Sequence, residues 1–323
     1  MAGWTPINPH PRISDVDVVN FDYASYAWED ILVQLNPDGI AIVTLNRPKA
    51  YNTFTGPMSY SIVFAFEVFD ADERVKVVIV TGAGKVFCAG AYLAQGFGAN
   101  ADHAQAHRDG GGQVGLAILR CRKPTIAAIN GNAIGIGVTM TLSCDFRLVA
   151  NNAKVAIPFV QRGIAMEACS SYLLPRLIGV TKTMDIILTG DVRNPSNSAF
   201  QPLWTRPPLP QDRVLPESLA LAQKLAQNSI VSMALCKAQI WRQVDSPEDA
   251  HLLESQAIWQ TSRLDGDEGV KSFMEKRKPS FKASIKDLER FSFWPWWRQT
   301  DVSLYPRGPE SLRAADSRAK SKL

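Results

Sequence analysis

Two short, continuous apolar runs, each ending in a glycine-rich turn, constrain the fold of this chain more than any other feature. The runs are VKVVIVTGAG at residues 75–84 and PTIAAING at residues 124–131. An apolar run without polar alternation predicts a strand that is buried on both faces. Helical apolar spacing precedes the first run, at residues 55–73. Buried strands that alternate with helices favour an α/β fold.

The flanking segments extend this alternation. Residues 30–48 carry two β-rich runs around Asn-Pro-Asp-Gly, which predicts a hairpin. The patterns farther along predict a short helix at 136–144, a third strand region at 146–157, and helices near 170–188. From about residue 215 the apolar spacing is helical throughout.

Two further stretches are distinctive, and together with the patterns above they suggest four parts. The Pro-rich stretch at 194–213 predicts a long surface loop, and FSFWPWW at 291–297 is expected to pack against the body of the protein. We expect an irregular arm (1–28), an α/β core (29–214), a helical C-terminal subdomain (215–290) and an aromatic, then polar tail (291–323).

Charge and cysteine content exclude several classes of protein. The 323 residues carry 35 basic and 31 acidic side chains, and the net charge of +4 is too small to indicate a nucleic-acid partner. No apolar run reaches the roughly 18 residues of a membrane span, and we expect no secretory leader. Five widely spaced cysteines predict buried free thiols of a reducing compartment: Cys88, Cys121, Cys144, Cys169 and Cys236.

The two glycine-rich turns, TGAGKVFCAGAYL (81–93) and INGNAIGIGVT (129–139), predict a site where the backbone approaches a ligand. Neither fits the G-x-G-x-x-G pattern of a dinucleotide site, and neither contains a P-loop. Turns from neighbouring units can direct two N–H groups at one carbonyl oxygen that becomes an oxyanion. Tight packing explains such glycines equally well on spacing alone.

One acidic residue, Glu167, stands by itself among small and apolar residues in VQRGIAMEACSSYLL (160–174). No other Asp or Glu occurs between Asp145 and Asp185. The residues alone allow two interpretations, a carboxylate near a helix N-terminus or a catalytic base. Cys169 is a weaker candidate nucleophile because none of the four histidines lies in a segment suited to activate it. No CxxC or HExxH pattern supports a metal site.

Four segments in order resemble the enoyl-CoA hydratase/isomerase (crotonase) superfamily over about residues 30–282. They are TLNRPKAYNTFT, VIVTGAGKVFCAGAYL, KPTIAAINGNAIGIGVTMTLSCDFRL and EGVKSFMEKRKPSF. The resemblance implies a spiral core of ββα repeats, a helical C-terminal subdomain that forms trimers, and acyl-CoA thioester chemistry. It also implies an oxyanion hole formed by the backbone N–H groups of Ala91 and Ile136.

The departures from the family pattern concern its acidic residues. Hydratases of this family carry two glutamates, where this chain has Thr139 and the pair Pro158-Phe159. Glu167 instead resembles the single base of the peroxisomal Δ3,Δ2-enoyl-CoA isomerase branch, whose motif is F-x-x-x-G-x-x-x-E-x-x-S-S. Phe159, Gly163, Glu167, Ser170 and Ser171 match that spacing. A base that moves a proton from C2 to C4 needs one carboxylate, with a pKa raised toward neutrality by apolar surroundings.

The resemblance further implies contacts with CoA, which is part of the substrate; no other cofactor and no metal are expected. Near the C-terminus, Phe273 and the two nearby lysines are expected at the nucleotide, from the same or a neighbouring subunit of a trimer or dimer of trimers. Tyr92 replaces an Asp that is frequent in the family. The expected CoA-binding residues are Lys49, Ala50, Cys88, Ala89, Gly90, Tyr92, Leu93, Lys276 and Lys278.

The last three residues, Ser321-Lys322-Leu323, form a peroxisomal targeting tripeptide that an import receptor would bind. We therefore expect a peroxisomal location. Three functions stay open: the isomerase; a hydratase or dehydratase acting on a specialised acyl-CoA of fatty acid oxidation or secondary metabolism; and a non-catalytic scaffold of the same fold. The absence of both hydratase glutamates favours the isomerase.

Overall fold

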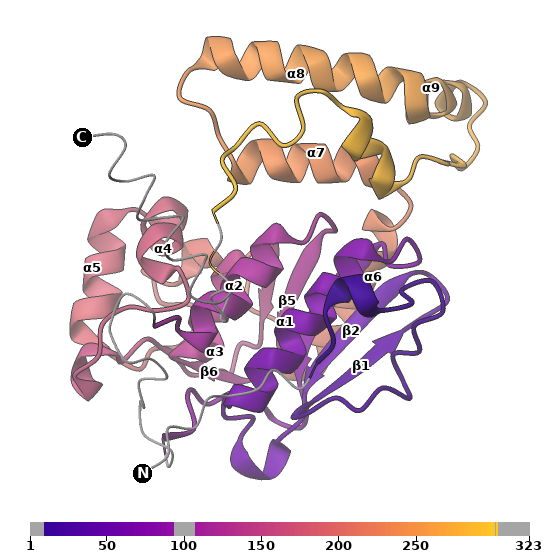
Figure 1. Ribbon diagram of the computed structural model, residues 1–323. Helices are drawn as coiled ribbons and strands as arrows, with labels where there is room; N and C mark the ends of the chain where they lie inside the picture. The colour runs from indigo at the N-terminus through magenta and orange to yellow at the C-terminus, as the bar shows by residue number, and fades with distance from the viewer. Residues whose placement is uncertain (1–9, 94–106, 301, 303–323) are drawn as a thin grey trace, which may run out of the picture.

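The computed structural model describes residues 10–93, 107–300 and 302, and its body is built on two sheets (Figure 1). The larger sheet has the strand order β1-β2-β3-β5-β7. β1 and β2 form the predicted antiparallel hairpin, and the other neighbouring pairs are parallel. The five strands are β1 (Ile31–Leu35), β2 (Ile40–Leu45), β3 (Val77–Gly82), β5 (Thr125–Ile129) and β7 (Phe146–Val149).

A smaller parallel sheet has the order β4-β6-β8, and each of its strands follows a strand of the larger sheet along the chain. The predicted third strand region at 146–157 is therefore two strands, β7 and β8, in different sheets. A helix follows each such pair, which gives the repeat ββα and confirms the crotonase-like α/β fold class. The strands are β4 (Val86–Cys88), β6 (Asn132–Ile134) and β8 (Val155–Ala156).

Glycine makes the sharp passage from one sheet to the other possible. A Cβ at Gly82 would lie 2.6 Å from the carbonyl oxygens of Val86 and Phe87, and one at Gly131 would lie 2.1 Å from that of Lys85. Any other residue at these two positions would push the strands apart. The glycine-rich turns are thus explained in part by close backbone packing.

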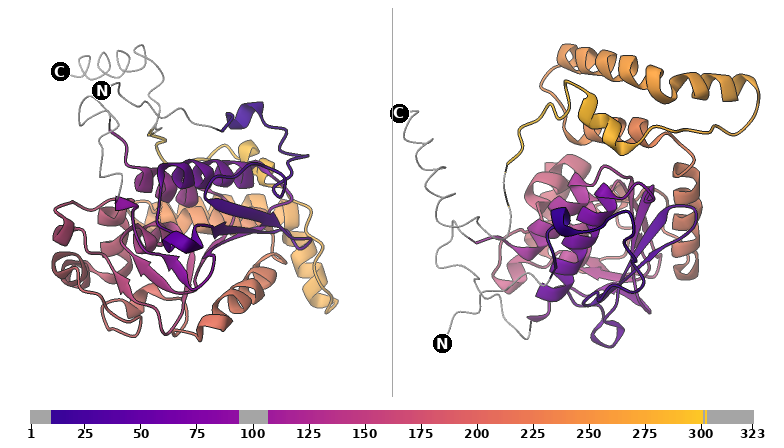
Figure 2. Two further views of the ribbon diagram at one scale, coloured as in Figure 1. Left: turned by 90° about the horizontal axis from the view of Figure 1, so that it is seen from below. Right: turned by 45° about the vertical axis from the view of Figure 1, so that its right-hand side comes forward.

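Helices cover both faces of the larger sheet (Figures 1 and 2). α1 packs against α2, and α6 packs against β3 and β5, although α6 falls in the range expected for the C-terminal subdomain. At the other end of the body, α4 and α5 pack against each other. The α-helices of the body are α1 (Gly56–Ala71), α2 (Gly110–Arg120), α3 (Ile136–Thr139), α4 (Ser170–Ile178), α5 (Val180–Thr189) and α6 (Val214–Leu225).

Short helical turns lie in the segments that connect the strands and α-helices. The predicted helix at 136–144 has α geometry only over α3 and continues as a 3-10 turn, η5. The described arm from residue 10 is irregular apart from η1, and it packs on the core, where the Tyr23 hydroxyl donates to Asp72 at 2.8 Å. These turns are η1 (Ile13–Asp15), η2 (Pro48–Ala50), η5 (Met140–Ser143), η6 (Val160–Arg162), η7 (Gln201–Leu203), η8 (Gln211–Arg213), the π-helical η9 (Ser262–Gly266) and η10 (Ile285–Arg290).

The prediction of a surface loop at 194–213 is wrong for its middle part. Phe200, Leu203 and Trp204 are buried in the main core, and the Trp204 indole N–H donates to the Pro195 carbonyl at 2.8 Å. Pro-rich irregular backbone indicates only that regular structure is absent. Burial follows here because the segment lies against β7, where the N–H of Thr205 donates to the Arg147 carbonyl at 2.9 Å.

The C-terminal helices form a layer of their own beside the body (Figures 1 and 2). A second apolar cluster holds this layer together: Leu235 of α7, Leu288 of η10 and Phe291 are buried in it, and Trp294 packs against it. The aromatic stretch therefore packs in an apolar cluster, but in that of the C-terminal layer and not in the main core of the body as expected. The three helices are α7 (Ile230–Trp241), α8 (Pro247–Thr261) and α9 (Asp267–Met274).

All five cysteines are free, as predicted, but they are not all buried. Cys88, Cys121 and Cys144 are buried, Cys169 is half-buried and Cys236 is exposed. Among the described residues no helix has both the length and the apolar character needed to cross a bilayer.

Candidate active site

The turns that carry Ala91 and Ile136 lie against each other. β4 and β6 are neighbouring parallel strands, with Cys88 opposite Ala133. Just beyond them, a Cβ on Gly137 would lie 2.4 Å from the Cys88 carbonyl oxygen, and one on Gly90 would lie 3.3 Å from that of Ile134. Glycine therefore allows the two turns to touch through their backbones, which brings the two predicted donors to one place.

Both predicted donors are available. Neither the Ala91 nor the Ile136 N–H donates to any residue that the structure describes. Ile136 opens α3, so its N–H has no acceptor within the helix. Phe54 pairs with both neighbours of Ala91, since its N–H donates to Gly90 and its carbonyl accepts from Tyr92, each at 2.9 Å. Two free N–H groups on adjacent turns can hold a thioester oxygen and the oxyanion that forms from it.

Glu167 lies in the turn that leads into α4, and the backbone there is strained. Ala168 and Cys169 have φ values of 54° and 57°, in the left-handed region that costs residues other than glycine about 1 kcal/mol or more each. The Ser170 N–H and hydroxyl both donate to the Glu167 carbonyl, at 2.9 and 2.5 Å, and hold this turn. Such strain is typical of a segment that positions a functional side chain.

The Glu167 carboxylate is enclosed by two helices. The Thr139 hydroxyl of α3 donates to Oε1. On the other side the first turn of α2 approaches so closely that a Cβ on Gly111 would lie 1.8 Å from Oε2. Oε2 accepts no hydrogen bond from a described residue. The hydrogen bond to Oε1 thus leaves Oε2 without a partner in the described part of the chain.

The surroundings of Glu167 raise its pKa to about 7. Burial is the main cause, because it disfavours the charged carboxylate. The Thr139 hydrogen bond lowers the pKa, and the nearby negative charge of Asp109 raises it. A carboxylate with a pKa near neutrality is suited to general base catalysis, as the sequence predicted for this residue.

Asp109 is a second carboxylate beside this site. It is the N-cap of α2, where its Oδ1 accepts from the Gly112 N–H at 2.5 Å and from the Ala168 N–H at 3.3 Å. It thereby links the start of α2 to the residue after Glu167. Asp109 also raises the pKa of the Cys169 thiol, although burial is the larger cause. A deprotonated Cys169 is disfavoured, which argues against it as a nucleophile.

The structure places only some of the predicted CoA-binding residues near Glu167. Cys88, Ala89 and Gly90 form the turn before Ala91, and the Glu167 charge raises the pKa of the Cys88 thiol further than burial alone. Arg47 lies over the Tyr92 ring, 4.9 Å from its centroid, so this exposed ring has a cationic neighbour in place of the frequent Asp. Lys49 and Ala50 lie in η2, and the carbonyl of the next residue, Tyr51, accepts from the Ala89 N–H at 3.1 Å; Leu93 is exposed.

The predicted C-terminal contacts are not part of this group. Phe273, Lys276 and Lys278 are exposed and lie at the end of α9, at the far end of the C-terminal layer from α3 and α4 (Figure 1). Ser321, Lys322 and Leu323 lie outside the described residues.

Sequence reasoning missed two site residues, Asp109 and Gly111, and treated Thr139 only as a missing glutamate. The signal for the first two was Asp-Gly-Gly-Gly at 109–112. Three successive glycines at the start of a helix are unfavourable for helix formation. Their presence indicates that another part of the chain must approach the helix backbone closely. The partner in that approach, 56 residues along the chain from Gly111, could not be named from local sequence.

Comparisons with known proteins identify the family of this chain. The sequence profile of the enoyl-CoA hydratase/isomerase family matches residues 36–284. The chain belongs to the enoyl-CoA hydratase/isomerase family. It is therefore an enzyme of the crotonase superfamily that acts on acyl-CoA, and the scaffold alternative is not supported.

Relatives within the enoyl-CoA hydratase/isomerase family match most of the chain. The protein is 42% identical to enoyl-CoA hydratase ACTT3 of Alternaria alternata over 83% of this chain and 91% of that one. It is 32% identical to mevalonyl-coenzyme A hydratase sidH of Aspergillus fumigatus over 78% and 95%. The crystal structure of enoyl-CoA hydratase from Bacillus anthracis superposes with a TM-score of 0.71, at 29% identity, over 79% and 99% of the two chains.

Proposed function

We propose that the protein is a Δ3,Δ2-enoyl-CoA isomerase. The observation that carries this proposal is the Glu167 carboxylate, with a pKa of about 7, which meets the same face of Gly111 as the Ile136 side chain. The N–H groups of Ala91 and Ile136 donate to no described residue. The positions where hydratases of the family carry their glutamates hold Thr139 and Phe159. A single base next to an oxyanion hole is sufficient for moving a proton between two carbons.

In this mechanism the thioester oxygen of a 3-enoyl-CoA accepts from the N–H groups of Ala91 and Ile136. Glu167 Oε2 takes a proton from C2, and the resulting dienolate is stabilised at its oxygen. The same carboxyl group then returns the proton to C4, so the double bond moves from C3 to C2. Thr139 holds Oε1 throughout. CoA enters as part of the substrate.

The direct test is an assay of the purified protein on 3-hexenoyl-CoA and 2-hexenoyl-CoA, with products separated by chromatography. We expect conversion of the 3-enoyl to the 2-enoyl thioester. If 3-hydroxyacyl-CoA were the only product, the hydratase function would replace the isomerase. If neither thioester reacted, both would be wrong for this chain length, and a panel of longer and branched thioesters would follow.

Hydration or dehydration of an acyl-CoA is the second candidate, and Asp109 favours it. Addition of water needs one group to orient the water and one to donate a proton. Asp109 supplies a second carboxylate near Glu167, since its Oδ1 accepts from the N–H of the next residue, Ala168, at 3.3 Å. All three of the similar proteins named above are called hydratases.

Asp109→Asn separates the two candidates, because asparagine still caps a helix but cannot act as an acid or base. For a hydratase we expect a loss of about 10²-fold or more in the rate of water addition. For an isomerase we expect proton transfer from C2 to C4 to persist. The product ratio from each thioester, measured by chromatography, distinguishes the outcomes.

The pH dependence of the isomerase should respond to Thr139 and Asp109 in opposite directions. Because Glu167 must be ionised to act as a base, kcat/KM should fall as the pH drops below about 7. Thr139→Val removes the hydrogen bond that lowers this pKa, so the fall should move to higher pH. Asp109→Asn removes the charge that raises it, so the fall should move to lower pH. Shifts of equal sign in the two pH profiles would contradict these roles.

We also propose that the protein forms trimers and is imported into peroxisomes. Exposed apolar side chains on the C-terminal layer support self-association, among them Trp259 of α8 and Phe273 of α9. Light scattering after size-exclusion chromatography would measure the mass of the particle. Removal of Ser321-Lys322-Leu323 from a fluorescent fusion should abolish its peroxisomal location.

A further inference from the structure

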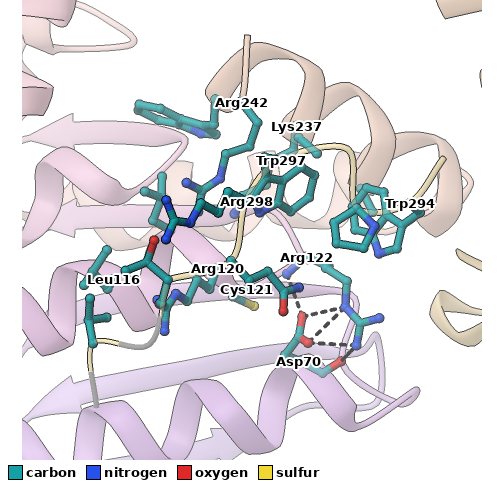
Figure 3. A pocket seen from close by; sticks show the side chains of 18 residues that line it. Asp70, Leu116, Arg120, Cys121, Arg122, Lys237, Arg242, Trp294, Trp297 and Arg298 are labelled. Atoms are coloured by element: carbon teal, nitrogen blue, oxygen red, sulfur yellow. Dashed lines mark hydrogen bonds and ion pairs between the residues drawn. The ribbon is translucent and has the colours of Figure 1, made fainter. Parts of the chain in front are cut away.

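A cavity whose lining does not include Glu167 lies where the C-terminal layer meets the body (Figure 3). Its volume is about 730 Å³, which is within the usual range for small-molecule sites. The second half of α2, helix α7 and the aromatic stretch after η10 form its walls. The lining includes three tryptophans, Trp241, Trp294 and Trp297.

Positive charge dominates the lining of this cavity. Five basic residues face one carboxylate, Asp70, which Arg122 already binds at 2.8 Å. Lys237 has its own partner, Asp145, at 2.9 Å. The remaining three bases, Arg120, Arg242 and Arg298, form no salt bridge within 4.0 Å among the described residues. Burial raises the pKa of Glu67, and the charge of Arg120 lowers it.

Neutral groups hold two of these arginines in place. Arg120 donates to the Thr300 carbonyl at 3.0 Å. Arg242 is half-buried at the end of α7, and its guanidinium carbon lies 5.4 Å from the centre of the Trp297 ring. Burial, and then the charge of Arg120, lower the pKa of Arg242. Both arginines line the cavity, and the positive charge of one disfavours that of the other, so an anion bound between them would offset this repulsion.

We propose that this cavity binds an oxyanion, a carboxylate or a phosphate, between Arg120 and Arg242, with the apolar part of the ligand against the tryptophans. The planar guanidinium fork matches either oxyanion by paired hydrogen bonds. Burial of an apolar body against indole rings adds affinity that a surface arginine pair lacks.

Two sources of this oxyanion fit the structure. One is a separate anionic ligand. The other is a carboxylate at the far end of an acyl chain whose thioester lies at Glu167, and this source alone rests on the proposed function. α2 joins the two places, because Gly111 touches Glu167 and Arg120 lies nine residues farther, about 14 Å along the helix. Thr300 and Val302 both contact this helix, where Arg120 donates to the Thr300 carbonyl at 3.0 Å and Gln113 to the Val302 carbonyl at 2.6 Å.

The test is titration of the full-length protein with inorganic phosphate, decanedioate and the mono-CoA thioester of decanedioate, followed by tryptophan fluorescence and calorimetry. We expect saturable binding of at least one of them that weakens tenfold or more in Arg242→Gln and in Arg120→Gln. Arg290→Gln, a matched change at an exposed arginine of η10, should leave binding unchanged. Arg242→Lys keeps the positive charge but lacks the planar guanidinium group. It replaces Arg242→Gln in the titration if the Gln variant does not fold.

The outcomes distinguish a separate anionic ligand from the end of an acyl chain, and they test the oxyanion site independently of the isomerase function. Binding of the free anions identifies a separate ligand, whereas binding of the thioester alone, with a KM that rises in the Arg242 variant, identifies the acyl end. No saturable binding of any of the three, or binding that neither arginine variant weakens, would overturn the proposal. Glu167→Gln should not alter binding of the free anions, so loss of turnover in that variant tests the proposed function separately.

Discussion

Glu167→Gln is expected to lower kcat/KM on 3-hexenoyl-CoA by about 10² to 10⁴-fold, the usual contribution of a general base. Glutamine has the shape of glutamate and its amide oxygen can still accept from the Thr139 hydroxyl. It cannot take a proton from C2 at any pH near neutrality. The acid limb of the pH profile near 7, which reports ionisation of Glu167, should therefore disappear from the residual activity.

Initial rates at several pH values measure this effect, and Glu254→Gln is the matched control. Glu254 lies exposed on α8, away from the site, so the same chemical change there should leave kcat/KM unchanged. Residual activity within threefold of the wild type in Glu167→Gln would show that another group is the base. At high pH the melting temperature of Glu167→Gln should equal or exceed that of the wild type, because a neutral amide avoids the burial of a charged carboxylate.

Gly111→Ala is expected to lower kcat/KM by about 10²-fold although residue 111 carries no reactive group. The added Cβ would lie 1.8 Å from Glu167 Oε2 and 2.8 Å from the end of the Ile136 side chain. Both atoms end flexible side chains, so they can move aside and the fold should survive. The carboxylate would then leave its position beside the oxyanion hole, and a displacement of about 1 Å can cost 10²-fold in rate.

The matched control for this substitution is Gly56→Ala, at the corresponding first turn of α1. A Cβ there meets nothing within 4 Å, so activity should be unchanged and stability slightly raised, by about 0.4–1 kcal/mol. Kinetics and thermal unfolding of both variants make the comparison. Full activity in Gly111→Ala would contradict the proposed contact between α2 and the base.

Local sequence patterns correctly predicted strands in which every residue is buried. The apolar runs of β3 and β5 are buried at every position, and the hairpin of β1 and β2 follows from its Asn-Pro-Asp-Gly turn. These predictions succeeded because each depends on neighbours a few residues away. The segment at 194–213 was mispredicted because its side chains are buried by β7 and not by regular structure of its own.

The sequence by itself determined the α/β class, the family and the single carboxylate at Glu167 in apolar surroundings. Only the tertiary structure decided what touches that carboxylate. Thr139, Gly111 and Asp109 lie 28, 56 and 58 residues away along the chain, and no local pattern encodes which of them meet. Their meeting depends on how three ββα units stack, because stacking directs the starts of α2 and α3 at one turn. The pKa of Glu167, set by burial and these contacts, is therefore a property of the folded chain.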